Sequence, residues 1–250
     1  MASFSFIIYF FMKKVVILID GQNLFYSLKE LDLMERDIDW TLLFGSLLES
    51  NDELIRAYWF RPQKILDGYY TAINIRNMLC TKKYKSHWDN FRNNPSLVPA
   101  NISEAIETEA KSIEDWMKHT REIFSNIDYN YDELQLKYEN VEMVKSGVLK
   151  IDPFKKQYVG EKGVDIALAV KMIALSVNNM CDKIILVSGD YDYGEAIKFV
   201  KDRMTKMHIV KIHKGYPPRN KSLSRDLAVL ADKIIDVYES DLRSRFVVST

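Results

Sequence analysis

The pattern of hydrophobic and polar residues predicts a strand, helix and strand near the start of the chain. KKVVILID (residues 13–20) and LIRAYWF (54–60) are runs rich in β-branched and aromatic residues, as in strands buried on both faces. Between them, residues 24–31 carry leucines at helical spacing, and Asp39 can cap a second helix. Two strands joined through helices predict a parallel, right-handed unit.

The same alternation resumes in the last third of the chain. VDIALAVKMIALSV (164–177) predicts a helix, while DKIILVSGD (182–190) and MHIVKIH (207–213) predict further strands. Apolar residues over 196–204 mark a helix between these two strands, and a short strand is expected at 234–238. The sequence therefore predicts an α/β fold whose central, mainly parallel sheet has helices on both sides.

The middle of the chain breaks this alternation. Residues 103–124 carry apolar side chains close to the helical period, and residues 64–80 are compatible with a helix. We therefore expect a largely helical insertion at about 64–130 within a domain that covers 12–250. Alternation on both sides of residues 145–147 predicts a β-hairpin there.

Residues 1–11, MASFSFIIYFF, form an apolar stretch that is too short to span a bilayer as a helix. Lysines follow it rather than precede it, which argues against a signal peptide. We expect a disordered extension or an over-long start, with Met12 as the natural beginning. A membrane-surface anchor is the alternative.

Composition adds little about the partner, because Lys+Arg and Asp+Glu both total 35. Charge is nevertheless segregated: residues 61–92 hold seven basic and two acidic residues, and residues 101–142 hold eleven acids and four bases. Two kinds of surface would produce this pattern: a basic face that binds a polyanion, or charged faces that only contact water. The two cysteines, Cys80 and Cys181, are isolated, which disfavours a zinc site and favours a reducing, cytoplasmic compartment.

Carboxylates follow two of the predicted strands at the point where each strand ends. Asp20 closes the first run, and Asp190 and Asp192 follow the strand within DKIILVSGD. Open parallel sheets bind ligands beyond the carboxyl ends of their strands, so these side chains meet if the two strands are neighbours. Asp165, at the start of the helix predicted over 164–177, is a fourth candidate.

Crowded carboxylates raise one another's pKa unless a cation intervenes. Mg²⁺ prefers oxygen ligands and supplies the chemistry of phosphodiester hydrolysis, since it activates water and stabilises charge on phosphate. Each residue also has a structural interpretation: Asp20 as a turn residue, and Asn23 or Asp192 as a helix cap. Ser188 either orients a metal-bound water or bonds within its turn, and the spacing of Tyr193 with Ile197 favours core packing for that tyrosine.

Other motif interpretations fail on detail. DYDYG resembles half of a calcium-binding loop, but the twelfth position from Asp190 is Lys201 instead of glutamate. The sequence has no P-loop, nucleophile elbow or GxGxxG motif.

VVILIDGQNLFYSL, KGVDIALAVKM and IILVSGDYDYGEAIKFVK, in this order, resemble the signature segments of NYN domains, specifically the LabA-like group of the PIN-like nuclease superfamily. The resemblance covers residues 13–62 and 158–238. It implies a PIN-like three-layer α/β/α sandwich and metal-dependent ribonuclease activity. It also implies that Mg²⁺ or Mn²⁺ is held by an acidic cluster: Asp20, Asp165, Asp190 and Asp192. Asn23 matches the polar residue after the first acid.

One departure concerns Lys171, which stands where the group often has an acid. The first hypothesis is a metal-dependent endoribonuclease acting on RNA, which we expect to be single-stranded. In it, Asn23 and Ser188 position water or phosphate, and four basic residues contact the RNA backbone: Arg61, Lys171, Lys211 and Lys214. The alternative is a catalytically weak or inactive PIN-like module that binds RNA or a protein. A third hypothesis is a small-molecule phosphohydrolase. We expect no membrane partner and consider a homodimer compatible with this fold.

Overall fold

The computed structural model describes residues 12–91, 98–219 and 223–247, and the expectation for residues 1–11 lies outside this part of the chain. The chain forms two compact units. Of the described residues, unit 1 comprises those up to Arg61, Tyr131–Ser146 and those from Gly163 onward. Unit 2 comprises Pro62–Asn130 and Gly147–Lys162.

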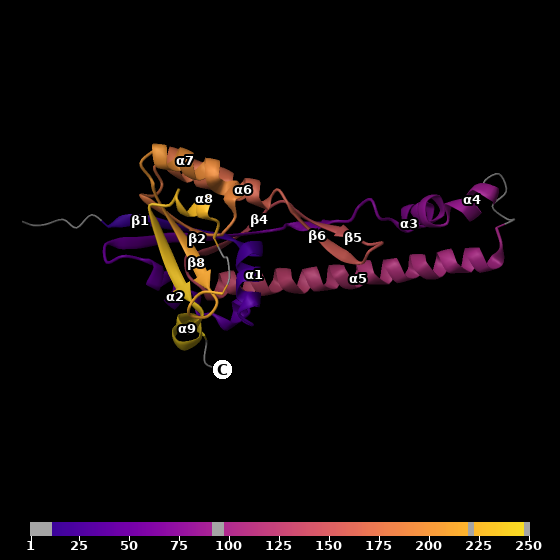
Figure 1. The fold of residues 1–250 in the computed structure, drawn as a ribbon, viewed down its shortest axis with the longest axis horizontal. Coiled ribbons are helices and arrows are strands. Elements are labelled where there is room, and N and C mark those ends of the chain that lie inside the picture. The colour runs from indigo at the N-terminus through magenta and orange to yellow at the C-terminus, as the bar shows by residue number, and fades with distance from the viewer. Residues whose placement is uncertain (1–11, 92–97, 220–222, 248–250) are drawn as a thin grey trace, which may run out of the picture. The chain divides into compact units, whose positions relative to one another are not determined.

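Unit 1 is built on a six-stranded sheet with the order β4-β2-β1-β7-β8-β9 (Figure 1). Every neighbouring pair in it is parallel. The strands are β1 (Lys13–Asp20), β2 (Asp52–Arg61), β4 (Val141–Lys145), β7 (Lys183–Val187), β8 (Lys206–His213) and β9 (Lys233–Tyr238). The strands predicted from the apolar runs are thus confirmed, and β4 joins them at the edge beside β2.

Helices cover both faces of this sheet and give unit 1 three layers. One core packs side chains of α1 (Gly21–Glu30), α2 (Trp40–Leu47) and the C-terminal turn Leu242–Phe246, which follows α9 (Glu239–Asp241), against one face. The other core packs α6 (Val164–Val177), α7 (Gly194–Asp202) and α8 (Arg225–Ala228) against the opposite face. The predicted α/β/α fold class is confirmed.

The predicted cap of the second helix is also confirmed, because the Asp39 carboxylate accepts a hydrogen bond from the Leu42 amide at the start of α2. The cap of α1 is Asp20 rather than Asn23. Buried Leu24 and Leu28 form the inner face of α1, as their spacing predicts.

Unit 2 combines helices with a small second sheet. Its strands, in the order β3-β5-β6, are β3 (Lys64–Leu66), β5 (Val148–Asp152) and β6 (Gln157–Lys162). Its helices are α3 (Ala72–Met78), α4 (Lys85–Phe91) and α5 (Ala100–Lys137), of which the residues after 130 belong to unit 1. The core of unit 2 holds Ile75, Leu79, Cys80, Ile106, Ala110, Ile113 and Met117.

The hairpin predicted around residues 145–147 is wrong. β4 pairs with β2 in the large sheet, whereas β5 pairs with β3 and β6 in the small one. Alternation correctly indicated two strands, but it does not identify their partners, because pairing depends on contacts far apart in sequence. Residues 64–66 are likewise a strand instead of the start of a helix. Throughout the described residues, no helix is long and apolar enough to cross a membrane.

Candidate active site

The carboxyl edge of the large sheet brings together the ends of β1 and β7. These strands are parallel neighbours, with Ile19 opposite Val187. Asp20 and Ser188 therefore emerge side by side on the same face, and the Ser188 hydroxyl donates a hydrogen bond of 3.0 Å to Asp20 Oδ2. The neighbouring strands assumed by the sequence argument are thus present.

Asp20 is a buried carboxylate, 9% exposed, held by three hydrogen bonds. Its Oδ1 accepts from the Asn23 amide at 3.0 Å, as the N-cap of α1. Its Oδ2 accepts from the Ser188 hydroxyl and also from the Tyr193 hydroxyl, again at 3.0 Å. The donors come from the first turn of α1, from the residue after β7 and from the turn Tyr191–Tyr193.

Burial raises the pKa of the Asp20 carboxyl, although the three hydrogen bonds act in the opposite direction. The negative charge of Asp190 raises this pKa further. Asp20 is therefore a carboxylate whose charge is costly to bury, and a cation at this edge would offset that cost.

Hydrogen bonds also shape the turn after β7. The Asn23 side-chain oxygen accepts from the Gly189 amide at 3.0 Å, which links α1 to the turn. The Asp190 amide donates to Ser188 Oγ at 3.2 Å, and Asp190 Oδ1 accepts from the Asp192 amide at 3.0 Å. Asn23 and Ser188 are thus engaged within the protein, where they hold the turn that presents Asp190.

The other acidic residues are exposed. Asp190 caps the short 3-10 turn Tyr191–Tyr193, and Asp192 lies within that turn. Asp165 lies in the first turn of α6. Burial raises the pKa of the Tyr193 phenol, and the charges of Asp20, Asp190 and Asp165 raise it further, so three candidate carboxylates act on this one side chain.

The four basic candidates have different surroundings. Arg61 is 3% exposed, lies 3.5 Å from Asp132 and contacts the Tyr131 ring, so a phosphate would have to displace these partners. The Lys171 ammonium lies 3.9 Å from the centre of the Tyr58 ring.

Lys214 donates to the backbone oxygen of Glu30. Lys211 is half-buried on β8, and alternation from buried Ile209 places it on the sheet face that carries Asp20 and Ser188. In the described ranges Lys211 forms no ion pair.

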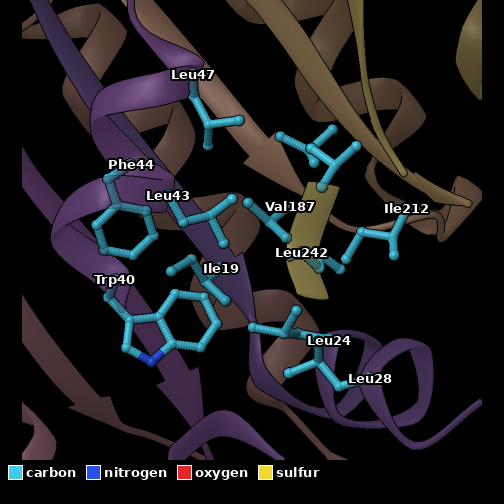
Figure 2. A pocket seen from close by; sticks show the side chains of 12 residues that line it. Ile19, Leu24, Leu28, Trp40, Leu43, Phe44, Leu47, Val187, Ile212 and Leu242 are labelled. Carbon is cyan, nitrogen blue, oxygen red and sulfur yellow. The ribbon is translucent and has the colours of Figure 1, made fainter. Parts of the chain in front are cut away.

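An apolar cavity of about 20 Å³ lies on the opposite face of the sheet (Figure 2). Ile19 and Val187 line it together with side chains of α1 and α2, including Leu24 and Phe44. No polar side chain other than the Trp40 indole contributes to its lining, so it is a packing space and not part of the acidic site.

A sequence model of the NYN domain family matches residues 70–239, which is more than half of the chain. The chain belongs to the NYN domain family. NYN domains are members of the PIN-like nuclease superfamily, so this membership supports a nuclease. The matched range includes Asp165, Ser188, Asp190 and Asp192, whereas Asp20 and Asn23 precede it. The finer assignment to the LabA-like group stays a prediction.

No curated protein matches this NYN domain sequence. A crystal structure of a protein of unknown function from Vibrio parahaemolyticus is similar to it at 14% identity, with a TM-score of 0.46. The alignment covers 95% of this chain and 98% of the other.

The donors at the acidic edge of this NYN domain are oxygen atoms, which suit Mg²⁺ or Mn²⁺. Within the residues described here, no three acidic, histidine or cysteine side chains are close enough to share one ion directly. Mg²⁺ commonly uses only one or two carboxylates and keeps several waters. The oxygen donors of this edge therefore suit an ion that keeps most of its water ligands.

Tyr193 is the residue of this edge that sequence reasoning missed. Its helical spacing with Ile197 predicted core packing, and the ring is indeed buried at 2% exposure. The same side chain also bonds the central carboxylate. Only its position six residues after the end of β7 hinted at this contact, because the partner lies far away in sequence.

Proposed function

We propose that this NYN domain protein is a metal-dependent endoribonuclease. This proposal rests on the buried Asp20 carboxylate, which accepts a hydrogen bond from the Ser188 hydroxyl at the neighbouring strand end. The same hydroxyl accepts from the amide of Asp190. This arrangement lies at the sheet edge where parallel α/β proteins bind ligands. Family membership supports a nuclease in general, and the metal and the RNA specificity are our proposal.

Mg²⁺ or Mn²⁺, when bound, lowers the pKa of its water and stabilises charge on a phosphate. Asp20 and Asp190 hold the ion, and exposed Asp165 and Asp192 orient its waters. Ser188 keeps the Asp20 carboxylate in place and also accepts from the Asp190 amide, so one hydroxyl couples the two ligands.

The proposed substrate is single-stranded RNA. Lys211 supports a phosphate-bearing substrate, since this half-buried residue lies on the sheet face of Asp20, where its ammonium would neutralise a backbone phosphate. Arg61 and Lys214 serve less well, because both already have partners within unit 1.

The alternative, an inactive RNA- or protein-binding module, rested on Lys171. The contact of its ammonium with the Tyr58 ring argues against this alternative. In the part of the chain that the structure describes, Lys171 forms no ion pair with Asp20, Asp165 or Asp190. The lysine therefore leaves these carboxylates available to a cation.

The test uses the purified chain with a circular and a linear labelled RNA of the same unstructured sequence, in Mn²⁺, Mg²⁺ or EDTA. With metal we expect cleavage of both RNAs, because an endonuclease needs no chain end and therefore also cuts the circle. In EDTA we expect no cleavage, because the chelator removes the divalent ion. Asp20→Asn and Asp190→Asn should each lower the rate at least 100-fold.

Asp202→Asn, an exposed aspartate at the end of α7, is the matched control and should retain the wild-type rate. Thermal unfolding of each variant shows whether it is folded. Asp20→Asn should fold well, since it removes a buried charge while its oxygen still caps α1. Full activity of both site variants, or cleavage in EDTA, would overturn the proposal. Cleavage of a chromogenic phosphate ester without cleavage of RNA would instead support the phosphohydrolase hypothesis.

A further inference from the structure

The two oxygens of Asp20 have unequal surroundings. Oδ2 accepts two hydrogen bonds, from the hydroxyls of Ser188 and Tyr193, each at 3.0 Å. Oδ1 accepts one, from the Asn23 amide, also at 3.0 Å. A carboxylate oxygen has about two lone-pair sites, so these donors fill Oδ2 and leave one site on Oδ1.

The Tyr193 hydroxyl is held in place by its own ring. The ring is 2% exposed and packs in the core that includes Val164, Ile197 and Leu227. A phenol buried in this way requires a hydrogen-bond partner, and Asp20 is that partner. The ring and the carboxylate consequently fix each other, and the plane of the carboxylate cannot rotate without breaking a buried hydrogen bond.

The Tyr193 hydroxyl joins two elements of the site, because Tyr193 lies in the turn after β7 while its acceptor, Asp20, ends β1. Phenylalanine would pack equally well here but would supply no donor.

We propose that Tyr193 is a positioning residue for the metal ligand Asp20: with Ser188 it saturates Oδ2 and leaves Oδ1 as the oxygen that binds a divalent cation. This inference rests on the proposed function. Hydrogen bonds to ligating carboxylates orient the ligand, and their loss commonly weakens metal binding about 10- to 100-fold.

The experiment measures Mn²⁺ binding to the full chain without RNA, by the decrease of the free-Mn²⁺ electron paramagnetic resonance signal. Tyr193→Phe should weaken Mn²⁺ binding about ten-fold or more. Ser188→Ala should act in the same direction. The double variant should lose less than the product of the two single effects, because both hydroxyls restrain the same oxygen.

Tyr138→Phe is the matched control. Tyr138 is also buried, at 6% exposure, and its hydroxyl donates to the Ile38 carbonyl at 3.1 Å, in the core on the opposite face of the sheet. This variant loses an equivalent buried hydrogen bond, so it should show a similar fall in melting temperature while its Mn²⁺ affinity is unchanged.

Three outcomes separate the two proposals. Unchanged Mn²⁺ affinity of Tyr193→Phe, with Asp20→Asn unable to bind, overturns the role of Tyr193 and leaves the proposed function intact. Equal losses in Tyr193→Phe and Tyr138→Phe also overturn it, since general destabilisation then explains the effect. Failure of the wild type to bind Mn²⁺ and to cleave RNA overturns the proposed function itself.

Discussion

Close backbone approach explains the glycine that follows Asp20. A Cβ atom at Gly21 would lie 2.5 Å from the carbonyl oxygen of Phe60 and 3.0 Å from the indole nitrogen of Trp59. Glycine therefore lets α1 begin directly against β2 while Asp20 caps it. In the DGQN segment, Gly21 is therefore explained by packing against β2, and Asp20 by its role as the cap of α1.

Gly21→Ala should lower the free energy of unfolding by about 1–3 kcal/mol, because the added methyl meets a backbone atom that cannot move aside cheaply. Gly45→Ala in α2 is the control. Nothing lies within 4 Å of a Cβ at Gly45, so this variant should gain about 0.5–1 kcal/mol from helix propensity. Urea denaturation measures both, and equal stability of the two variants would contradict the packing argument.

Ion pairs between elements of unit 2 explain part of the charge segregation along the chain. In unit 2, basic residues of the first segment bind acids of α5: Arg76 with Glu107 at 2.8 Å, and Lys83 with Glu109 at 2.8 Å. Arg121 of α5 binds Asp67 at 2.6 Å. Arg76 and Lys83 of the basic segment 61–92 are therefore engaged with helix α5, which explains part of the segregation by pairing within unit 2.

A charge exchange tests this pairing. Arg76→Glu and Glu107→Arg should each lower the free energy of unfolding, because each places like charges together on a partly exposed surface. The double variant should recover part of the loss, as a double-mutant cycle at low salt will show. Strictly additive losses would mean that the two side chains do not interact.

At the scale of the whole of unit 1, a second charged cluster joins distant strands at the amino edge of the sheet. Lys183 of β7, whose side chain is 2% exposed, lies 2.6 Å from Asp52 of β2 and 2.9 Å from Glu49. Lys233 of β9 lies 2.8 Å from the other oxygen of Glu49. The two lysines lower the pKa of the Glu49 carboxyl from 4.5 to about 2.

This lowered pKa predicts a pH dependence. A carboxyl that ionises more readily in the folded state stabilises it above the unfolded pKa of 4.5, and the stabilisation disappears as pH falls towards 2. The melting temperature of the wild type should therefore exceed that of Glu49→Gln at pH 7. The difference should shrink between pH 4.5 and 2. A difference that stays constant across this range would show that the ion pairs contribute no stability.

Much of the candidate site could be predicted because its determinants are local. Asp20 and Asp190 each follow a continuous apolar run, and the parallel arrangement of those runs places both residues at one edge. The partners of Arg61 and Lys171 could not be predicted. Asp132 and Tyr58 lie far from them in sequence and become neighbours only when β2, α5 and α6 pack.

The sequence by itself determined the alternation of strands and helices, the α/β class and the acidic ends of two strands, because hydrophobic periodicity and turn residues act over short stretches. Only the tertiary structure decided that β4 and β5 belong to different sheets, that Arg76 pairs with Glu107 of α5, and that the Tyr193 hydroxyl bonds Asp20. These features depend on which distant surfaces meet, and side-chain partners in a packed core are chosen by the whole fold.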